Sequence, residues 1–187
     1  NVKLQVPGGA RDITGMHLVI LSNQGNIQLS AFGDHIRVFI GAGCAVRANI
    51  QLAGQATLFM GDGCTLATTR IIAANADVVL GDDCQLLDDV LLQGSDQHPV
   101  TDLVSGEVVN AHRRQVSIGR HVLVGRRSTI LPDVKVGDGA IIEAGSVVSQ
   151  DVGAQTQVSG APATVIRARA GWARQFGKAP PDLDLTP

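Results

Sequence analysis

The 187-residue chain carries 15 basic and 17 acidic side chains, and its formal net charge of −2 favours neither nucleic acid nor an anionic membrane as the main partner. Hydrophobic residues make up 44% and aromatic residues only 3%, with 22 glycines, which predicts one domain with a core of small and branched aliphatic side chains. No stretch approaches the roughly 18 apolar residues of a membrane span, and no basic region precedes an apolar run at the amino terminus, so we expect a cytoplasmic protein.

The first two dozen residues, which include PGGARDITG at 7–15, favour strand and turn. A loose repeat starts near Gly25 and then becomes regular. The segments IGAGC, MGDGC and LGDDC begin at Ile40, Met60 and Leu80, each 20 residues after the last.

Within each unit an aliphatic residue recurs every six positions, a period that fits neither an α-helix nor an alternating strand. This period predicts a coil with three flat faces, in which each face has one short strand and one turn and the aliphatic residue points inward. The pattern resumes at Ile118 and Val136, which are 18 residues apart, one complete three-sided turn. The 20-residue units are therefore expected to carry two extra residues at a corner.

Cys44, Cys64 and Cys84 occupy the fifth position of equivalent hexads, where alanine or serine stands elsewhere. We therefore expect small side chains that point into the coil. An odd number of cysteines in a cytoplasmic chain favours reduced thiols. No metal site is expected, because one coil face offers no tetrahedral set of ligands.

The repeat breaks in the middle of the chain. On the 20-residue register the next corner should fall near residue 100, yet it appears at Ile118. The intervening VTDLVSGEVVNAHRRQ has no aliphatic residues at six-residue intervals and contains a turn signal, which predicts an extruded loop over about 96–116. Because functional residues concentrate on long loops of rigid scaffolds, we expect the site there.

The hexads, together with IIEAGSVVSQDV at 141–152 and VSGAPATVIR at 158–167, resemble the hexapeptide-repeat acyltransferases over roughly residues 25–172. The resemblance implies an all-β fold, a left-handed parallel β-helix that assembles as a homotrimer and binds acyl-coenzyme A in clefts between subunits. The arrangement SDQHPVTDLVSGEVVN followed by VSIGRHVLVG looks most like the sugar, capsule and exopolysaccharide O-acetyltransferases. The chain departs from that branch at Leu123, where tryptophan is usual.

In such an enzyme, His98 at the root of the loop would be the general base that takes the proton of a sugar or polysaccharide hydroxyl as it attacks the thioester of acetyl-CoA. Asp96 is the nearest candidate to hold the other ring nitrogen, with Asp102, Glu107 or a carboxylate of an adjacent subunit as rivals. Among the other histidines, we expect His112 to have a smaller chance of touching substrate. His17 and His35 are expected at the surface or in packing, and His121 in the coil.

The resemblance also places the coenzyme A arm beside the late coils, with the phosphate end near Arg167 and the pantetheine beside Gly125, Arg126, Ala144, Ser149 and Gln150. The backbone N–H of Gly125 is a candidate donor to the oxyanion of the reaction. Thr164 replaces a lysine that is usual in the family, which weakens the expected phosphate contact.

Residues 1–166 are expected to form the β-helix domain and 167–187 a short helix and a flexible tail. The helix is predicted over RARAGWARQF, with Trp172 packed on the end of the coil.

Three other functions are alternatives to O-acetylation. An N-acetyltransferase that acts on a nucleotide-linked amino sugar or an antibiotic would share the fold and donor. A γ-class carbonic anhydrase would need histidines where Arg126 and Leu131 stand, so its zinc site is missing and no metal is required. A non-catalytic β-helical scaffold would need neither the loop histidine nor the closing Ala-Pro-Ala segment.

Overall fold

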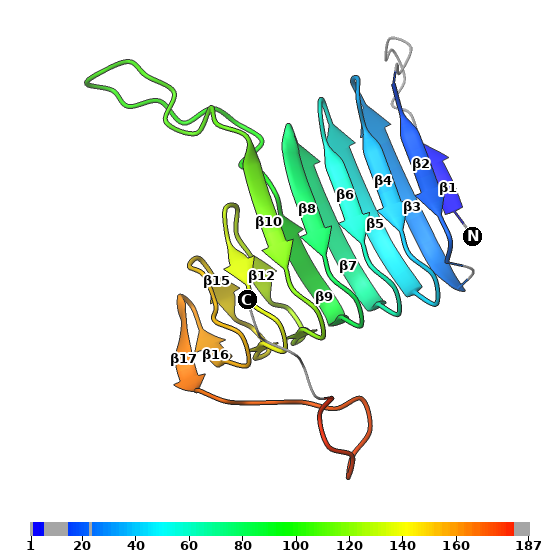
Figure 1. Cartoon of the computed structure of the whole chain (residues 1–187). Coiled ribbons are helices and arrows are strands. Elements are labelled where there is room, and N and C mark those ends of the chain that lie inside the picture. The colour runs from blue at the N-terminus through cyan, green and yellow to red at the C-terminus, as the bar shows by residue number, and fades with distance from the viewer. Residues whose placement is uncertain (1, 6–14, 23, 182–187) are drawn as a thin grey trace.

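The computed structural model describes residues 2–5, 15–22 and 24–181, so most of the strand and turn predicted over 7–15 lies outside the described residues. The chain winds as a left-handed parallel β-helix, an elongated stack of coils from which one loop projects (Figure 1). The described residues form strands and turns, and none of their segments is a helix that could cross a membrane.

The coil has three faces. Face 1 is a six-stranded sheet of β2 (His17–Ile20), β4 (Arg37–Ile40), β6 (Thr57–Met60), β8 (Ala76–Leu80), β10 (Arg114–Ile118) and β13 (Lys135–Val136). Faces 2 and 3 are the two halves of the long strands β3 (Gln24–Phe32), β5 (Ala45–Ala53), β7 (Thr65–Ala74) and β9 (Gln85–Gln93). Face 2 continues in β11 (Leu123–Val124), β14 (Ile141–Ile142) and β16 (Gln157–Gly160), and face 3 in β12 (Thr129–Ile130) and β15 (Val147–Val148). β1 (Val2–Gln5) pairs with β3, and β17 (Ala163–Arg167) runs antiparallel to β16.

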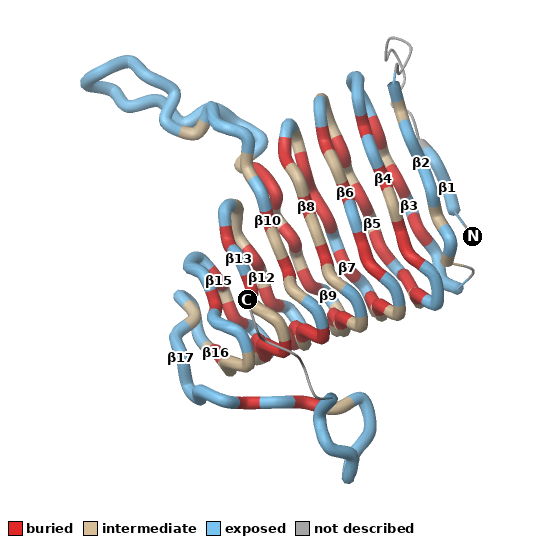
Figure 2. Tube along the Cα trace, in the orientation of Figure 1, coloured by how far each residue is buried: buried red, intermediate tan, exposed pale blue. Residues whose placement is uncertain are grey.

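The predicted six-residue period is confirmed by burial. With one exception, the residues that start successive hexads point into the coil and are at most 1% exposed: Ile40, Val46, Leu52, Met60, Leu66, Leu80, Leu86, Leu92, Ile118, Val124, Ile130, Val136, Ile142 and Val148. The exception is Ile72, which stands in register with Gln51 and Gln93, because a bulge in its strand moves the inward positions to Ile71 and Ala73. Figure 2 shows these buried positions as bands along every coil. Because each hexad contributes one such side chain per face, stacking the coils produces one continuous aliphatic core.

The two extra residues of the longer coils lie in the strands of face 1 and not at a corner as expected. β4 and β6 have four residues, whereas β13 of an 18-residue coil has two. The added pair alternates inward and outward like any strand residues, so it lengthens the face without disturbing the inward pattern.

The glycine corners are held by hydrogen bonds between neighbouring coils. The carboxylate of Asp62 accepts a hydrogen bond from the backbone N–H of Ala42 at 2.8 Å, and that of Asp82 accepts one from Asp62 at the same distance. The Cys64 thiol inside the corner donates to the carbonyl of Gly81 at 3.2 Å, and its hydrogen-bonded neighbour Cys84 and its burial raise its pKa. At the equivalent position of a later coil, the hydroxyl of Ser128 donates to the carbonyl of Glu143 at 2.9 Å. This position lies against the backbone of the next coil, which explains why small side chains recur there.

The short C-terminal helix was predicted wrongly. Residues 168–181 cross the coils as an extended segment with turns. The N–H of Ala170 donates to the carbonyl of Gln155 at 2.8 Å, and Arg169 has a φ of 55°, so the backbone bonds to the coil instead of to itself. Trp172 nevertheless packs on the coil as expected, at 8% exposure beside Ile141 and Leu123.

Candidate functional site

The loop between β9 and β10 spans residues 94–113 and projects from the edge where face 3 meets face 1, here called the loop edge (Figure 1). Its outer part is a hairpin with an antiparallel bridge between Thr101 and Val108. The carboxylate of Asp102 accepts hydrogen bonds from the N–H groups of Val104 and Ser105, each at 2.8 Å, and these bonds lower its pKa. Asp102 thus closes the hairpin turn.

Asn110 locks the base of the loop. Its side-chain oxygen accepts a hydrogen bond from the N–H of Val100 at 2.8 Å, and its amide nitrogen donates to the carboxylate of Asp96 and to the carbonyl of His98, both at 2.9 Å. Arg114 at the start of β10 donates to the same carboxylate of Asp96 at 2.6 Å. The bonds from Asn110 and Arg114 hold the pKa of Asp96 below its usual range.

The backbone of His98 is therefore held, while its side chain is exposed to solvent. It lines a hollow of about 220 Å³ together with Asn75, Asn110, His112 and Arg114. Within the described part of the chain, Asp96 bonds to Asn110 and Arg114 and makes no hydrogen bond to the imidazole. Asp96 anchors the loop in a single chain, and its predicted role toward the ring of His98 stays a prediction.

The geometry supports a larger role for His112 at the site than the sequence predicted. Its Nε2 lies 2.9 Å from a carboxylate oxygen of Asp133, which also bonds to the Arg114 guanidinium. Burial alone would raise the pKa of Asp133, but the bonds from His112 and Arg114 outweigh it and lower the pKa. The sequence signal was the position of Asp133 at the matching corner of the next coil, directly beside the loop root.

The residues expected to bind coenzyme A fall on two edges of the coil. Gly125, Arg126 and Ala144 lie at turns where face 2 meets face 3, whereas Ser149 and Gln150 follow β15 on the loop edge, one coil beyond Asp133. One chain therefore brings Ser149 and Gln150 toward the side of His98 and leaves the other three on the opposite side of face 3. Arg167 is exposed at the end of β17, past the last coil.

The N–H of Gly125 is not free to stabilise an oxyanion, because it donates to the carbonyl of Ile142 at 2.8 Å. A Cβ at this position would lie 2.4 Å from the backbone nitrogen of Ala144, so the glycine is needed for close stacking of two coils. The guanidinium of Arg126 points toward the preceding coil, where it donates to the carboxylate of Asp88 at 2.7 Å. This hydrogen bond lowers the pKa of Asp88.

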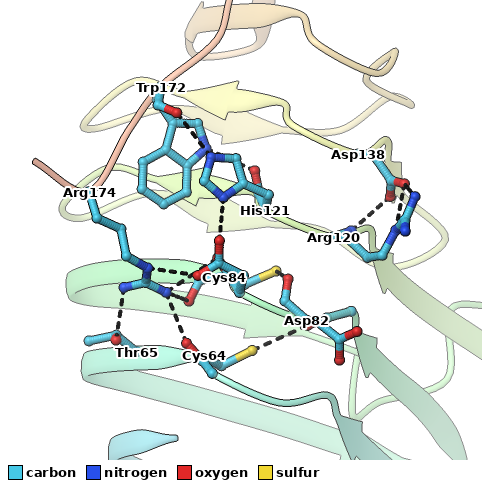
Figure 3. A network of polar contacts seen from close by, with 12 residues as sticks. Cys64, Thr65, Asp82, Cys84, Arg120, His121, Asp138, Trp172 and Arg174 are labelled. Carbon is cyan, nitrogen blue, oxygen red and sulfur yellow. Dashed lines mark hydrogen bonds and ion pairs between the residues drawn. The ribbon is translucent and has the colours of Figure 1, made fainter. Parts of the chain in front are cut away.

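His121 is part of the coil, as expected, and holds the C-terminal segment (Figure 3). Its ring stacks on Trp172 with centroids 4.0 Å apart, and its two nitrogens lie 2.6 Å from Asp83 and 2.9 Å from the carbonyl of Trp172. The indole N–H donates back to the carbonyl of His121 at 2.8 Å. Arg174 donates to Asp83 at 2.7 Å and to the carbonyl of Gly63 at 2.9 Å, so it ties the segment to two further coils.

Comparison with known proteins matches residues 115–150 to the family described as bacterial transferase hexapeptide (six repeats). Among curated proteins, the chain is 44% identical over 68 residues to the dTDP-4-amino-4,6-dideoxy-D-glucose acyltransferase of Escherichia coli, a match that covers 36% of this chain and 35% of that protein. The chain thus spans only about a third of the length of this curated relative.

Two solved structures resemble nearly the whole chain. The polySia-specific acetyltransferase NeuO superposes with a TM-score of 0.80 at 24% identity, covering 95% of this chain and 90% of that chain. The polysialic acid O-acetyltransferase OatWY superposes with a TM-score of 0.62 at 24% identity, covering 94% and 92%. At this identity the similarity establishes the fold. Residues 115–150 thus match the hexapeptide-repeat transferases, and the chain as a whole shares the fold of these two acetyltransferase structures.

Proposed function

We propose that this chain transfers an acetyl group from acetyl-CoA to a hydroxyl of a sugar or polysaccharide, with His98 as the general base. The observation that carries the proposal is the exposed imidazole of His98 in a hollow at a loop root whose backbone is held by Asn110. A neutral imidazole there accepts the hydroxyl proton as the oxygen attacks the thioester carbonyl, and returns it to the departing sulfur. The names of the solved structures, which include an O-acetyltransferase, support the hydroxyl acceptor.

We further propose that the active unit is a homotrimer with the site between chains. The predicted coenzyme A residues lie on two edges of one chain, so a single cleft can contain His98, Gly125, Arg126 and Ala144 only if neighbouring chains contribute them. Arg126 and Arg167 are exposed cations suited to the phosphates of coenzyme A, and Ser149 and Gln150 offer polar contacts to its amide arm.

Transfer to an amino group is the second candidate. It is favoured by the sequence match to an acyltransferase that acts on a 4-amino sugar linked to dTDP. The two reactions need the same acetyl donor and the same general base, so only the identity of the acceptor distinguishes them.

The test is a thioester-cleavage assay with acetyl-CoA and matched panels of neutral, acidic and amino saccharides. His98→Ala is expected to reduce turnover by about 10²–10⁴-fold, because general bases commonly contribute that much. His17→Ala, which removes an exposed histidine of β2 on face 1, is the matched control and should retain full turnover. Unchanged turnover in His98→Ala would remove this residue from the mechanism, and turnover restricted to amino saccharides would favour the second candidate.

A further inference from the structure

A second and larger hollow lies away from the loop, along the edge where faces 2 and 3 meet in the early coils. It has a volume of about 760 Å³ and is called the groove here. One wall is a ladder of residues that are register partners on β1, β3, β5, β7 and β9: Lys3, Gln28, Asn49, Arg70 and Leu91. The floor is the adjacent ladder of Ala48, Thr69 and Val90, and the second wall contains Asn26, Arg47, Thr68 and Asp89.

The groove results from the way the long coils pass this edge. In the later coils a tight turn separates face 2 from face 3, whereas β5 and β7 run through the edge as single strands. Their pairing shifts register between Val46 and Ala48, and between Thr68 and Thr69. Such bulges bend a strand and redirect its side chains. Nothing in the proposed reaction uses this feature.

The groove is cationic although the chain as a whole is acidic. Among the residues that the structure describes, Lys3, Arg47 and Arg70 line it against a single carboxylate, Asp89. None of the ion pairs between described residues involves these three cations, and Arg70 has only a 3.4 Å contact with the amide of Gln51. Unpaired cations on both walls of a groove attract an extended anion.

The groove also contains buried polar atoms without a partner. The side-chain oxygens of Asn49 and Thr69 are both buried and make no hydrogen bond to any described residue. Thr69 is only 3% exposed. Buried polar atoms are almost always paired in folded proteins, and leaving one unpaired costs about 1–3 kcal/mol. Thr69 stands in register with the core residues Ala48 and Val90, so its hydroxyl faces the coil, whereas Asn49 belongs to the wall of the groove.

We infer that the groove binds a segment of an acidic oligosaccharide, with its carboxylates beside Arg47 and Arg70 and its hydroxyls against the side-chain amides of Asn26 and Asn49. A saccharide carries both kinds of group at every unit, and the ladder offers an amide or guanidinium on successive coils spaced about 4.8 Å apart. None of the described residues that line the groove is aromatic, so this lining lacks the stacking platforms of single-stranded nucleic acid sites. The choice of a saccharide rests on the proposed function, and the groove would hold a long acceptor while another part of it reaches the catalytic hollow.

The binding test compares wild type with Arg47→Ala/Arg70→Ala, using a carboxylate-bearing decamer of galacturonic acid and a neutral dextran oligomer without acetyl-CoA. We expect the acidic decamer to bind at least 10-fold more weakly to the double variant, and the dextran to bind weakly to both. Arg37→Ala/Lys135→Ala removes the same charge from exposed positions of face 1 and should leave binding unchanged. Equal binding of the decamer to wild type and groove variant would overturn the inference, as would equally tight binding of single-stranded DNA.

Asn49→Ala tests the polar wall of the groove separately. Because the side-chain oxygen of Asn49 has no partner in the described chain and its amide nitrogen makes a long 3.5 Å contact with Gln28, the variant should fold with nearly unchanged stability and yet bind the decamer about 3- to 10-fold more weakly. Loss of stability without loss of binding would show that Asn49 is structural. Sedimentation of the Arg47→Ala/Arg70→Ala variant is the remaining control, and a changed number of subunits would show that a second copy covers the groove.

Failure of this inference is distinguishable from failure of the proposed function. If the groove variants transferred acetyl groups normally and bound the decamer as tightly as wild type, only the inference about the groove would be overturned. If decamer binding depended on Arg47 and Arg70 but the chain cleaved no acetyl-CoA, only the proposed reaction would be overturned.

Discussion

Gly125 shows how a residue expected at a binding site is in fact required by the stacking of coils. Its N–H bonds to Ile142, and a side chain there would meet the backbone of the next coil at 2.4 Å. The family resemblance places coenzyme A beside this residue, but the local geometry is explained by packing alone. A substitution can therefore separate the two roles.

Gly125→Ala is expected to lower the free energy of unfolding by about 1–3 kcal/mol, the usual range for forcing extra volume into a packed structure. Gly106→Ala at the loop hairpin is the control, since a Cβ there meets nothing within 4 Å and only its φ of 74° is unfavourable. Urea unfolding of both variants measures the difference. If Gly125→Ala lost no more stability than Gly106→Ala, the coil-stacking explanation would be wrong.

At the scale of elements, the C-terminal segment is held by side chains rather than by helical structure. Trp172 and Arg174 bond to residues of the coils that lie 51 to 111 positions earlier in the chain. The stacked rings of His121 and Trp172 form its centre, and Arg174 extends it to Gly63 and Asp83. Burial raises the pKa of Asp83, but the stronger effect of His121 and Arg174 lowers it, as expected for a carboxylate that bridges two cation-capable groups.

His121→Ala should release this segment, because the carbonyl of Trp172 would lose its donor in a buried position, at a cost of about 1–3 kcal/mol. Trp172 is the single tryptophan of the chain, so its fluorescence reports the segment directly. The emission should move to longer wavelength and become accessible to iodide. Phe176→Ala, at a fully exposed position, should leave the spectrum unchanged. Identical spectra for His121→Ala and wild type would show that other contacts hold the segment.

At the scale of the whole molecule, the separation of the predicted site residues leads to a test of subunit sharing. His98→Ala and Ala144→Trp would each inactivate a trimer, the first by removing the base and the second by filling an exposed position of the proposed donor site. If each site takes His98 from one chain and Ala144 from its neighbour, mixed trimers regain activity at about one site in four, given random assembly of a closed ring.

The measurement is acetyl-CoA turnover of co-expressed variants, with separately purified and mixed trimers as the control for exchange. Activity no higher than that of the two separate variants would mean that one chain supplies both residues. Such a result would contradict a site shared between subunits, but it would not contradict the role of His98 as the general base.

The sequence by itself determined the repeat, the inward aliphatic positions and the place of the extruded loop, because these depend on a local six-residue period and on its interruption. It also determined that Cys64 and Ser128 stand at equivalent positions, since a small side chain recurs there at a fixed offset. Only the tertiary structure shows which corners share an edge: it brings His112, with its partner Asp133, into the hollow that His98 lines and leaves Gly125 on another side. It also decided that the C-terminal segment runs extended and that a cationic groove opens along the early coils, because both arise from contacts between coils that no local pattern encodes.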